Sequence, residues 1–319
     1  MGSIPVAPAR ENKMGRKAKT IFGLLAMIFI IAFLVFLYFY PHKFSRKAVE
    51  ETNDIKVESI VIEPTEVNDP GEDNPTPVKI DLQPVVDSWV NAAGGTKSIL
   101  IYDLDRAETV GEYNKGQNFN TASLYKLFVV YEGYRRIQNG AWGREDRANY
   151  LGQTILDCLD LAIRESNSTC AEPLWAKIGH AELDAIIKSD FDIQSSNISG
   201  LSSNVGDIAK IMQKFYTHEE IVDEDLVARM KDSFLNQPIT NGYEWRQGLP
   251  SGFSDSTKVY DKVGWAYNAG GRYWDYYHDA AIIETANNRH FIVVVMTSRV
   301  PYERISEFGT QIEAEIKKY

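Results

Sequence analysis

The feature that most constrains this chain is an uninterrupted apolar run of twenty residues, Ile21–Tyr40, which contains no charged side chain. As a helix the run would be about 30 Å long at ~1.5 Å per residue, which matches the hydrocarbon core of a bilayer. The segment before it holds one acid, Glu11, and five basic side chains: Arg10, Lys13, Arg16, Lys17 and Lys19. By the positive-inside rule, this asymmetry predicts a cytoplasmic tail over residues 1–19 and a transmembrane anchor over residues 20–40.

No small-x-small cleavage site follows the apolar run, so we expect an uncleaved signal anchor. Between Glu50 and Asp81 the sequence has ten acids, two lysines, four prolines and no aromatic residue. Such a segment cannot bury enough apolar surface to fold, and its like charges repel one another. Residues 41–81 are therefore predicted to form an extended, acidic extracellular stalk on a single-pass protein of the cell membrane.

Residues 82–319 are long enough for one large domain. The chain has a net charge of −10, so neither nucleic acid nor an anionic lipid surface is expected as a partner of this domain. The predicted elements are a helix over 82–93, strands over 98–104 and 110–113, a helix from Ser123 to Ile137, helices without a convincing strand over 144–233, strands over 259–267, 277–284 and 290–297, and a helix over 303–318. This order predicts an α+β fold in which one antiparallel, five-stranded sheet, built from both ends of the chain, is flanked by helices and interrupted by an all-helical block.

Ser123-Leu124-Tyr125-Lys126 opens the helix that precedes the all-helical block. If Ser123 is the first helical residue, Lys126 lies one turn further on the same face, with its amine within reach of the hydroxyl. A serine hydroxyl is a weak nucleophile until a base removes its proton, and burial can lower the pKa of a lysine enough to make it that base. The spacing predicts Ser123 as a nucleophile and Lys126 as its base, although a serine cap and a solvated lysine would have the same spacing.

Two further segments follow in a set order. Ser166-Asn167-Ser168 comes after an apolar helix, and Lys262-Val263-Gly264 lies in a predicted strand before a turn. With Ser123 and Lys126, they resemble the S-x-x-K, S-D-N and K-T-G motifs of the class A serine β-lactamases and the penicillin-binding D,D-peptidases. The resemblance covers nearly all of residues 82–319 and implies the same α+β architecture.

The resemblance also implies a role for each motif residue. Ser166 would pass a proton toward the leaving nitrogen, and Lys262 would offer a cation to the substrate carboxylate. The substrate would also meet Ser168, which replaces an asparagine of the family, and Val263, which replaces a threonine and lacks its hydroxyl. Gly264 would let the substrate backbone approach the strand, and the backbone N–H groups of Ser123 and Trp265 would form the oxyanion hole.

Hydrolysis in class A β-lactamases uses a glutamate from a long loop, and this chain shows no counterpart. The span Ile187–Val205 contains no glutamate and is too short for such a loop, while Glu182 lies earlier, in a predicted helix, where a solvated side chain is expected. His278 and Asp279 suggest a Ser-His-Asp triad, but neighbouring strand residues point to opposite faces, so a direct couple between them is not expected. We therefore predict that an acyl-enzyme of this protein is cleared slowly.

Cys158 and Cys170 flank the Ser166 segment. An extracellular compartment permits a disulfide, and adjacent antiparallel helices could bring the two residues together, but two buried thiols are the commoner outcome in a domain of this size. The sequence therefore leaves open whether Cys158 and Cys170 are bonded. Their spacing suits no metal site, and no cofactor is expected.

Together these features predict a membrane-anchored, extracellular active-site serine hydrolase that forms a Ser123 acyl-enzyme with β-lactams. Two alternatives stay open. The first is a D-Ala-D-Ala carboxypeptidase that acts on cell-wall peptide. The second is a non-hydrolysing, penicillin-recognising sensor or cell-wall-binding module.

Overall fold

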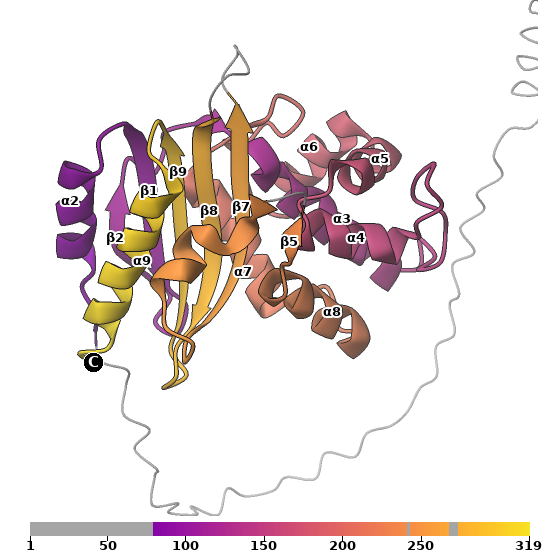
Figure 1. Cartoon of the computed structure of the whole chain (residues 1–319). Coiled ribbons are helices and arrows are strands. Elements are labelled where there is room, and N and C mark those ends of the chain that lie inside the picture. Colours follow the sequence, from indigo (N-terminus) through magenta and orange to yellow (C-terminus); the bar gives the residue numbers. More distant parts are fainter. Residues whose placement is uncertain (1–78, 241–242, 268–273) are drawn as a thin grey trace, which may run out of the picture. The chain divides into compact units, whose positions relative to one another are not determined.

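A computed structural model describes residues 79–240, 243–267 and 274–319 (Figure 1). The predicted tail, the predicted anchor and residues 41–78 of the predicted stalk lie outside the described residues. Ile80, which the sequence analysis placed in the stalk, is only 1% exposed and packs in the core, so folded structure begins before Leu82. Within the described ranges, no helix combines the length and the apolar character that a membrane span requires.

A five-stranded antiparallel sheet with strand order β2-β1-β9-β8-β7 forms the centre of the domain. Its strands are β1 (Thr96–Asp103), β2 (Glu108–Tyr113), β7 (Lys258–Tyr267), β8 (Trp274–Glu284) and β9 (His290–Ser298). The two ends of the chain meet where β1 pairs with β9, from Thr96 opposite Ser298 to Asp103 opposite Phe291. The predicted α+β fold and its sheet are therefore confirmed, and β7, which carries Lys262, is an edge strand.

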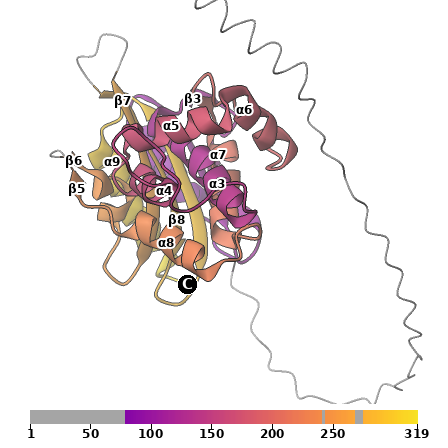
Figure 2. The same cartoon turned by 90° about the vertical axis from the view of Figure 1, so that its right-hand side faces the viewer.

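Helices cover both faces of this sheet (Figures 1 and 2). On one face lie α2 (Gln83–Ala92) and α9 (Tyr302–Ile316). The other face carries the helical block, which consists of α3 (Tyr125–Gln138), α4 (Ile155–Arg164), α5 (Ser168–Ile178), α6 (His180–Ser189), α7 (Val205–Thr217) and α8 (Glu224–Leu235). Because β9 lies between two hydrophobic clusters, Phe291–Met296 are all buried instead of alternating.

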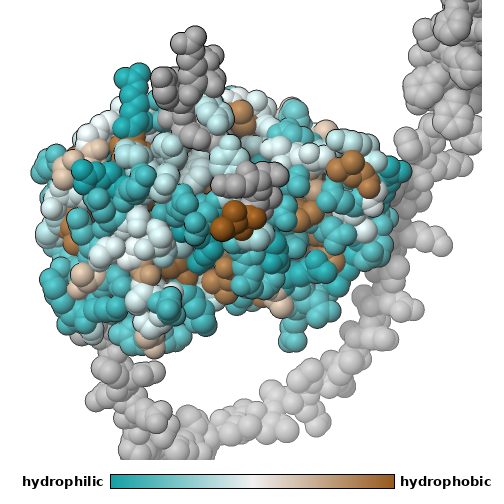
Figure 3. Space-filling view, in the orientation of Figure 1, coloured by the Kyte–Doolittle hydropathy of each residue, from teal (hydrophilic) through white to brown (hydrophobic). Residues whose placement is uncertain are grey.

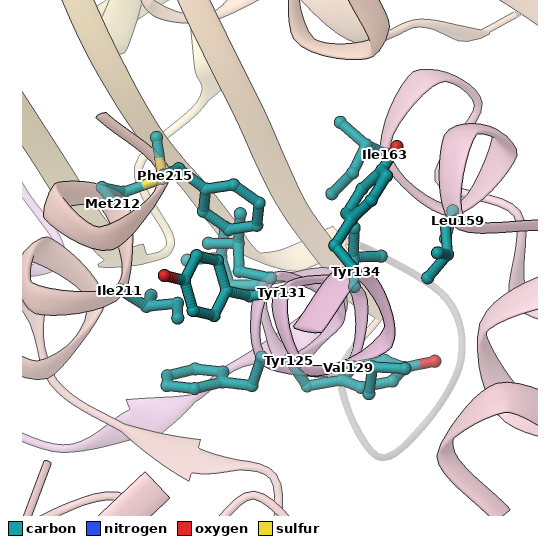
Figure 4. Packing of buried hydrophobic residues seen from close by; sticks show 14 of the residues in the cluster. Tyr125, Val129, Tyr131, Tyr134, Leu159, Ile163, Ile211, Met212 and Phe215 are labelled. Atoms are coloured by element: carbon teal, nitrogen blue, oxygen red, sulfur yellow. The ribbon is translucent and has the colours of Figure 1, made fainter. Parts of the chain in front are cut away.

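Helix α3 is the centre of the helical block (Figure 4). Ten consecutive residues, Tyr125–Tyr134, are buried, so the helix is enclosed on every side. Tyr131 packs edge-to-face on Phe215 of α7, with ring centroids 5.2 Å apart. Lys126 lies within this enclosed stretch, and its amine is therefore held in a medium of low polarity.

The outer surface is mixed in character. On the face shown in Figure 3, hydrophobic side chains form small, scattered groups between hydrophilic ones. Among the large apolar side chains, Tyr150, Leu151, Val222 and Ile239 are the more exposed ones. Isolated apolar residues of this kind are ordinary on a protein surface.

Two pairs of short strands were not predicted. β3 (Phe119–Asn120) pairs with β4 (Ser202–Ser203), and β5 (Ile239–Thr240) pairs with β6 (Tyr243–Glu244). The prediction of no strand within residues 144–233 is therefore wrong at Ser202–Ser203, because two residues are too few to give a periodic pattern. The β3–β4 pair brings the loop before α7 against the segment that leads to Ser123.

Cys158 of α4 and Cys170 of α5 form a disulfide, which answers the question that the sequence left open. The helices lie side by side, and the chain between them reverses at Ser166 and Asn167, which leaves the two Cα atoms 4.7 Å apart. Both cysteines are fully buried. The bond therefore closes the turn that carries Ser166.

Replacing both cysteines by serine should lower the free energy of unfolding by about 3 kcal/mol. The disulfide restricts the conformations of the unfolded chain, and for a loop of this length the lost entropy corresponds to a free energy of about that size. Denaturant unfolding of the wild type with and without dithiothreitol, beside the double variant, measures this effect. Reductant should lower the midpoint of the wild type and leave that of the variant unchanged. Equal midpoints for the oxidised wild type and the variant would contradict the expectation.

Candidate active site

Ser123 lies in a 3-10 turn, Ala122–Leu124 (η1), which directly precedes α3. The α-helix begins at Tyr125, two residues later than predicted. Two hydrogen bonds hold this turn: Thr121 N donates to the backbone oxygen of Leu201 at 2.8 Å, and Ala122 N donates to the side-chain Oδ1 of Asn120 at 2.9 Å. Ala122 has a φ of 45°, which non-glycine residues rarely adopt. The strained turn leaves Ser123 half-buried.

The Lys126 amine is buried and donates to the Ser166 carbonyl oxygen and to Ser168 Oγ at 3.1 Å. Ser166 Oγ lies 3.4 Å from it. Burial lowers the pKa of Lys126 to about 8, although the Glu172 carboxylate acts in the opposite direction. Among the described residues no hydrogen bond joins the amine to Ser123, but such contacts often form only when a substrate is bound.

Lys262 of β7 approaches the same serine from the sheet. Its amine donates to Ser166 Oγ at 2.9 Å and to Val263 O at 2.6 Å. Burial and the charge of Lys126 lower the pKa of Lys262 well below its usual value, while Asp261 and Asp279 oppose this change. The Ser166 hydroxyl therefore lies between two buried amines, as a proton relay requires.

Asn167, and not Ser166, caps helix α5. Its side chain accepts a hydrogen bond from Cys170 N at 3.1 Å. Ser166 precedes the cap with a φ of 51°. The Ser166 hydroxyl therefore remains available to the two lysines.

Gly264 packs against the nucleophile turn of its own chain. A Cβ atom at this position would lie 2.8 Å from both Thr121 O and Leu124 Cγ. The absence of a side chain at this glycine therefore lets β7 touch η1, and its predicted role toward a substrate stays a prediction. Close contact of β7 with η1 also brings the backbone of Trp265 near that of Ser123.

The remaining predicted substrate residues differ in accessibility. Ser168 is exposed, whereas Val263 is only 1% exposed, so Val263 can offer a substrate little beyond its main chain. Trp265 is half-buried, and its ring stacks on that of Tyr302 with centroids 5.7 Å apart. Of these three side chains, that of Ser168 is thus the most open to solvent.

His278 and Asp279 point to opposite faces of the sheet, as predicted. His278 Nδ1 accepts from Thr297 N at 3.0 Å, so Nε2 carries the hydrogen that it donates to Asn120 O at 2.7 Å. Asp279 accepts from Leu249 N on the other face at 2.7 Å. His278 therefore anchors the segment before Ser123 and is not paired for catalysis.

Two residues near Lys126 were missed by the sequence analysis. Tyr125 donates its phenol hydrogen to the Glu172 carboxylate of α5. No motif signals this pair, because it depends on α3 and α5 lying side by side. Glu182, in contrast, is 57% exposed and pairs with Arg136, which lies ten residues beyond Lys126 on α3, or about 15 Å along the helix.

No group of three or more His, Cys, Asp and Glu side chains in the described ranges is arranged to hold a metal ion.

The family model for the β-lactamase enzyme family matches residues 81–319. The chain belongs to the β-lactamase enzyme family. The resemblance drawn from the three motifs is therefore confirmed at the level of the family, as is a β-lactamase-like serine hydrolase fold.

Solved structures share this β-lactamase fold at low sequence identity. The class A β-lactamase of the last common ancestor of Gram-negative bacteria has a TM-score of 0.62 and 16% identity, over 72% of this chain and 97% of that one. PBP-A has a TM-score of 0.62 and 17% identity, over 77% of this chain and 100% of that one. No curated protein matches the sequence.

Gly264→Ala should push η1 away from β7 and so slow acylation of Ser123, with a loss of about 1–3 kcal/mol of stability from overpacking. Gly116→Ala is the matched control, because nothing lies within 4 Å of a Cβ atom built there. Thermal unfolding and the rate of labelling by a penicillin measure the two effects. Labelling of the Gly264 variant at the rate of the control would contradict this account of the contact.

Burial lowers the pKa of His278 to about 4, so the folded state holds this imidazole neutral. The unfolded state protonates it near its ordinary value of ~6.5, so the folded state should lose stability as the pH falls from about 6.5 to about 4, by on the order of 3 kcal/mol. The free energies of unfolding of the wild type and His278→Gln at pH 7 and pH 5 isolate this contribution. The wild type should lose more stability than the variant over that interval, and equal losses would contradict the assignment.

Proposed function

We propose that this protein is a membrane-anchored, extracellular serine hydrolase that forms a covalent acyl-enzyme on Ser123 with β-lactams. The observation that supports this most directly is the Lys126 amine, buried one turn beyond Ser123, with a pKa lowered to about 8. A lysine of this kind has a neutral fraction near neutral pH that can accept the Ser123 proton. The membrane anchor and the extracellular location rest on the sequence of residues 1–40.

Acylation would use the groups already assembled. As Ser123 Oγ bonds to the lactam carbonyl carbon, its proton moves to Lys126, and the carbonyl oxygen takes negative charge. The N–H groups of Ser123 and Trp265 would stabilise that charge. When the lactam C–N bond breaks, Ser166 would give its proton to the nitrogen and regain one from Lys126.

Deacylation is proposed to be slow. The Ile187–Val205 span returns to the site at Ser202–Ser203, which pairs with the segment before Ser123 and brings no carboxylate. The two acids of this span are engaged elsewhere, since Asp190 pairs with Arg135 and Asp192 with Lys210. A base for the hydrolytic water is therefore limited to Lys126 or a carboxylate outside the span.

A D-Ala-D-Ala carboxypeptidase is the second candidate, and the same observation favours it. Lys126 can serve as the base in both steps when the departing D-alanine leaves room for water, whereas a bound β-lactam remnant blocks that approach. Cell-wall peptide would then be turned over while β-lactams are trapped.

Incubation with a penicillin should add one penicilloyl mass to the wild type and none to Ser123→Ala, whose fold should persist because it loses only a turn residue. Intact-mass spectrometry checks this. With excess chromogenic cephalosporin, a burst near one equivalent followed by a slow phase is expected. A wild type that never gains the mass would refute the nucleophile, and sustained rapid turnover would refute slow deacylation.

A further inference from the structure

Two hydrogen bonds join the start of α3, where the buried Lys126 lies, to the exposed face of α5. Lys126 donates to Ser168 Oγ at 3.1 Å, and Tyr125, the residue before it, donates to the Glu172 carboxylate. Ser168 and Glu172 are four residues apart on α5 and so lie on one face of that helix. The exposed carboxylate of Glu172 therefore lies on the same face of α5 as the Ser168 hydroxyl that the proposed base contacts.

Packing holds the Tyr125 side chain in place. Tyr125 is only 5% exposed, and its ring lies against that of Trp175, with centroids 4.9 Å apart. Burial and the neighbouring Glu172 raise the pKa of Tyr125 well above its usual value. The phenol therefore stays neutral at physiological pH and acts as a donor to Glu172.

The charged groups around Lys126 come from two elements. Glu172 of α5 favours the protonated Lys126 amine, while the charge of Lys126 disfavours that of Lys262 on β7. Asp261 and Asp279 lie behind Lys262 and act on that lysine. Glu172 is thus the acidic group that acts on Lys126 from the solvent side, which lets it control how much of the amine is neutral.

We propose that Glu172, held in place by Tyr125, is a positioning residue whose charge sets the pH range in which Ser123 is acylated. The inference rests on the proposed hydrolase function. A charged Lys126 amine cannot accept the Ser123 proton, so the negative Glu172 restricts acylation to higher pH. The same charge stabilises the Lys126 ammonium that forms during acylation, and this ammonium then returns a proton to Ser166 as Ser166 protonates the leaving nitrogen.

The test is the second-order rate of acylation by a penicillin between pH 5.5 and pH 9.5, measured on the full-length chain in detergent. Glu172→Gln keeps an acceptor for Tyr125 but removes the charge, so the acidic limb of the rate profile should move to lower pH. A shift on the order of half to one pH unit is expected, because one exposed charge is removed. Tyr125→Phe removes the hydrogen bond that holds the Glu172 carboxylate in place, and it should move the acidic limb in the same direction by a smaller amount.

Glu182→Gln is the matched control, because it removes an exposed carboxylate at the distant Arg136 pair. Its profile should superimpose on that of the wild type. If the wild type is acylated but the acidic limb of Glu172→Gln lies at the same pH as that of the wild type, the inference is overturned and the proposed function is not. The same holds if the rate of Glu172→Gln falls equally at every pH. A wild type that is not acylated at any pH would overturn the proposed function, and the inference with it.

Discussion

The hydroxyl of Ser166 is the point on which the rest of the site depends. It lies 2.9 Å from the Lys262 amine and 3.4 Å from the Lys126 amine, and both lysines are fully buried. Two ammonium groups this close repel each other, and burial penalises both, so the arrangement favours a neutral amine. A neutral amine beside a serine hydroxyl can accept a proton, as the proposed acylation of Ser123 requires.

Such an arrangement costs stability, and other parts of the fold offset that cost. Behind Lys262, on the opposite face of β7, the carboxylate of Asp261 accepts from Arg246 at 2.7 Å. Asp279 lies on that same face, where burial and the nearby Asp261 raise its pKa well above the usual value. These groups favour the charged form of Lys262, and Glu172 does the same for Lys126. Each lysine thus has an acidic group near it that limits the loss of its charge.

Three contacts hold the three elements of the site in register. Gly264 and His278 are directly opposite each other on β7 and β8, and both touch the segment around Ser123. The disulfide closes the turn between α4 and α5 that presents Ser166. The sheet and the helical block are therefore in close contact around Ser123 and Ser166.

The sheet, the helical block and the positions of Ser123, Lys126, Ser166 and Lys262 were predictable, because long periodic segments and motif spacing are local properties of a sequence. The Cys158–Cys170 bond, the Tyr125–Glu172 pair and the role of Gly264 were not, because each depends on which elements pack side by side. Ile80 was assigned to the stalk because the charged residues of that segment are mostly acidic. Composition does not reveal that one side chain in the segment packs in the core. The tail, the anchor and residues 41–78 of the stalk stay predictions.

Burial lowers the pKa of Lys126, and burial together with the charge of Lys126 lowers the pKa of Lys262. Titration of ¹⁵N-labelled lysine side chains by NMR, with signals assigned from Lys126→Met and Lys262→Met, measures this directly. The account predicts that the Lys126 amine loses its proton near pH 8 and that the Lys262 amine also titrates below the ordinary lysine value. Two amines that both remain charged to about pH 10, near the ordinary lysine pKa, would contradict it.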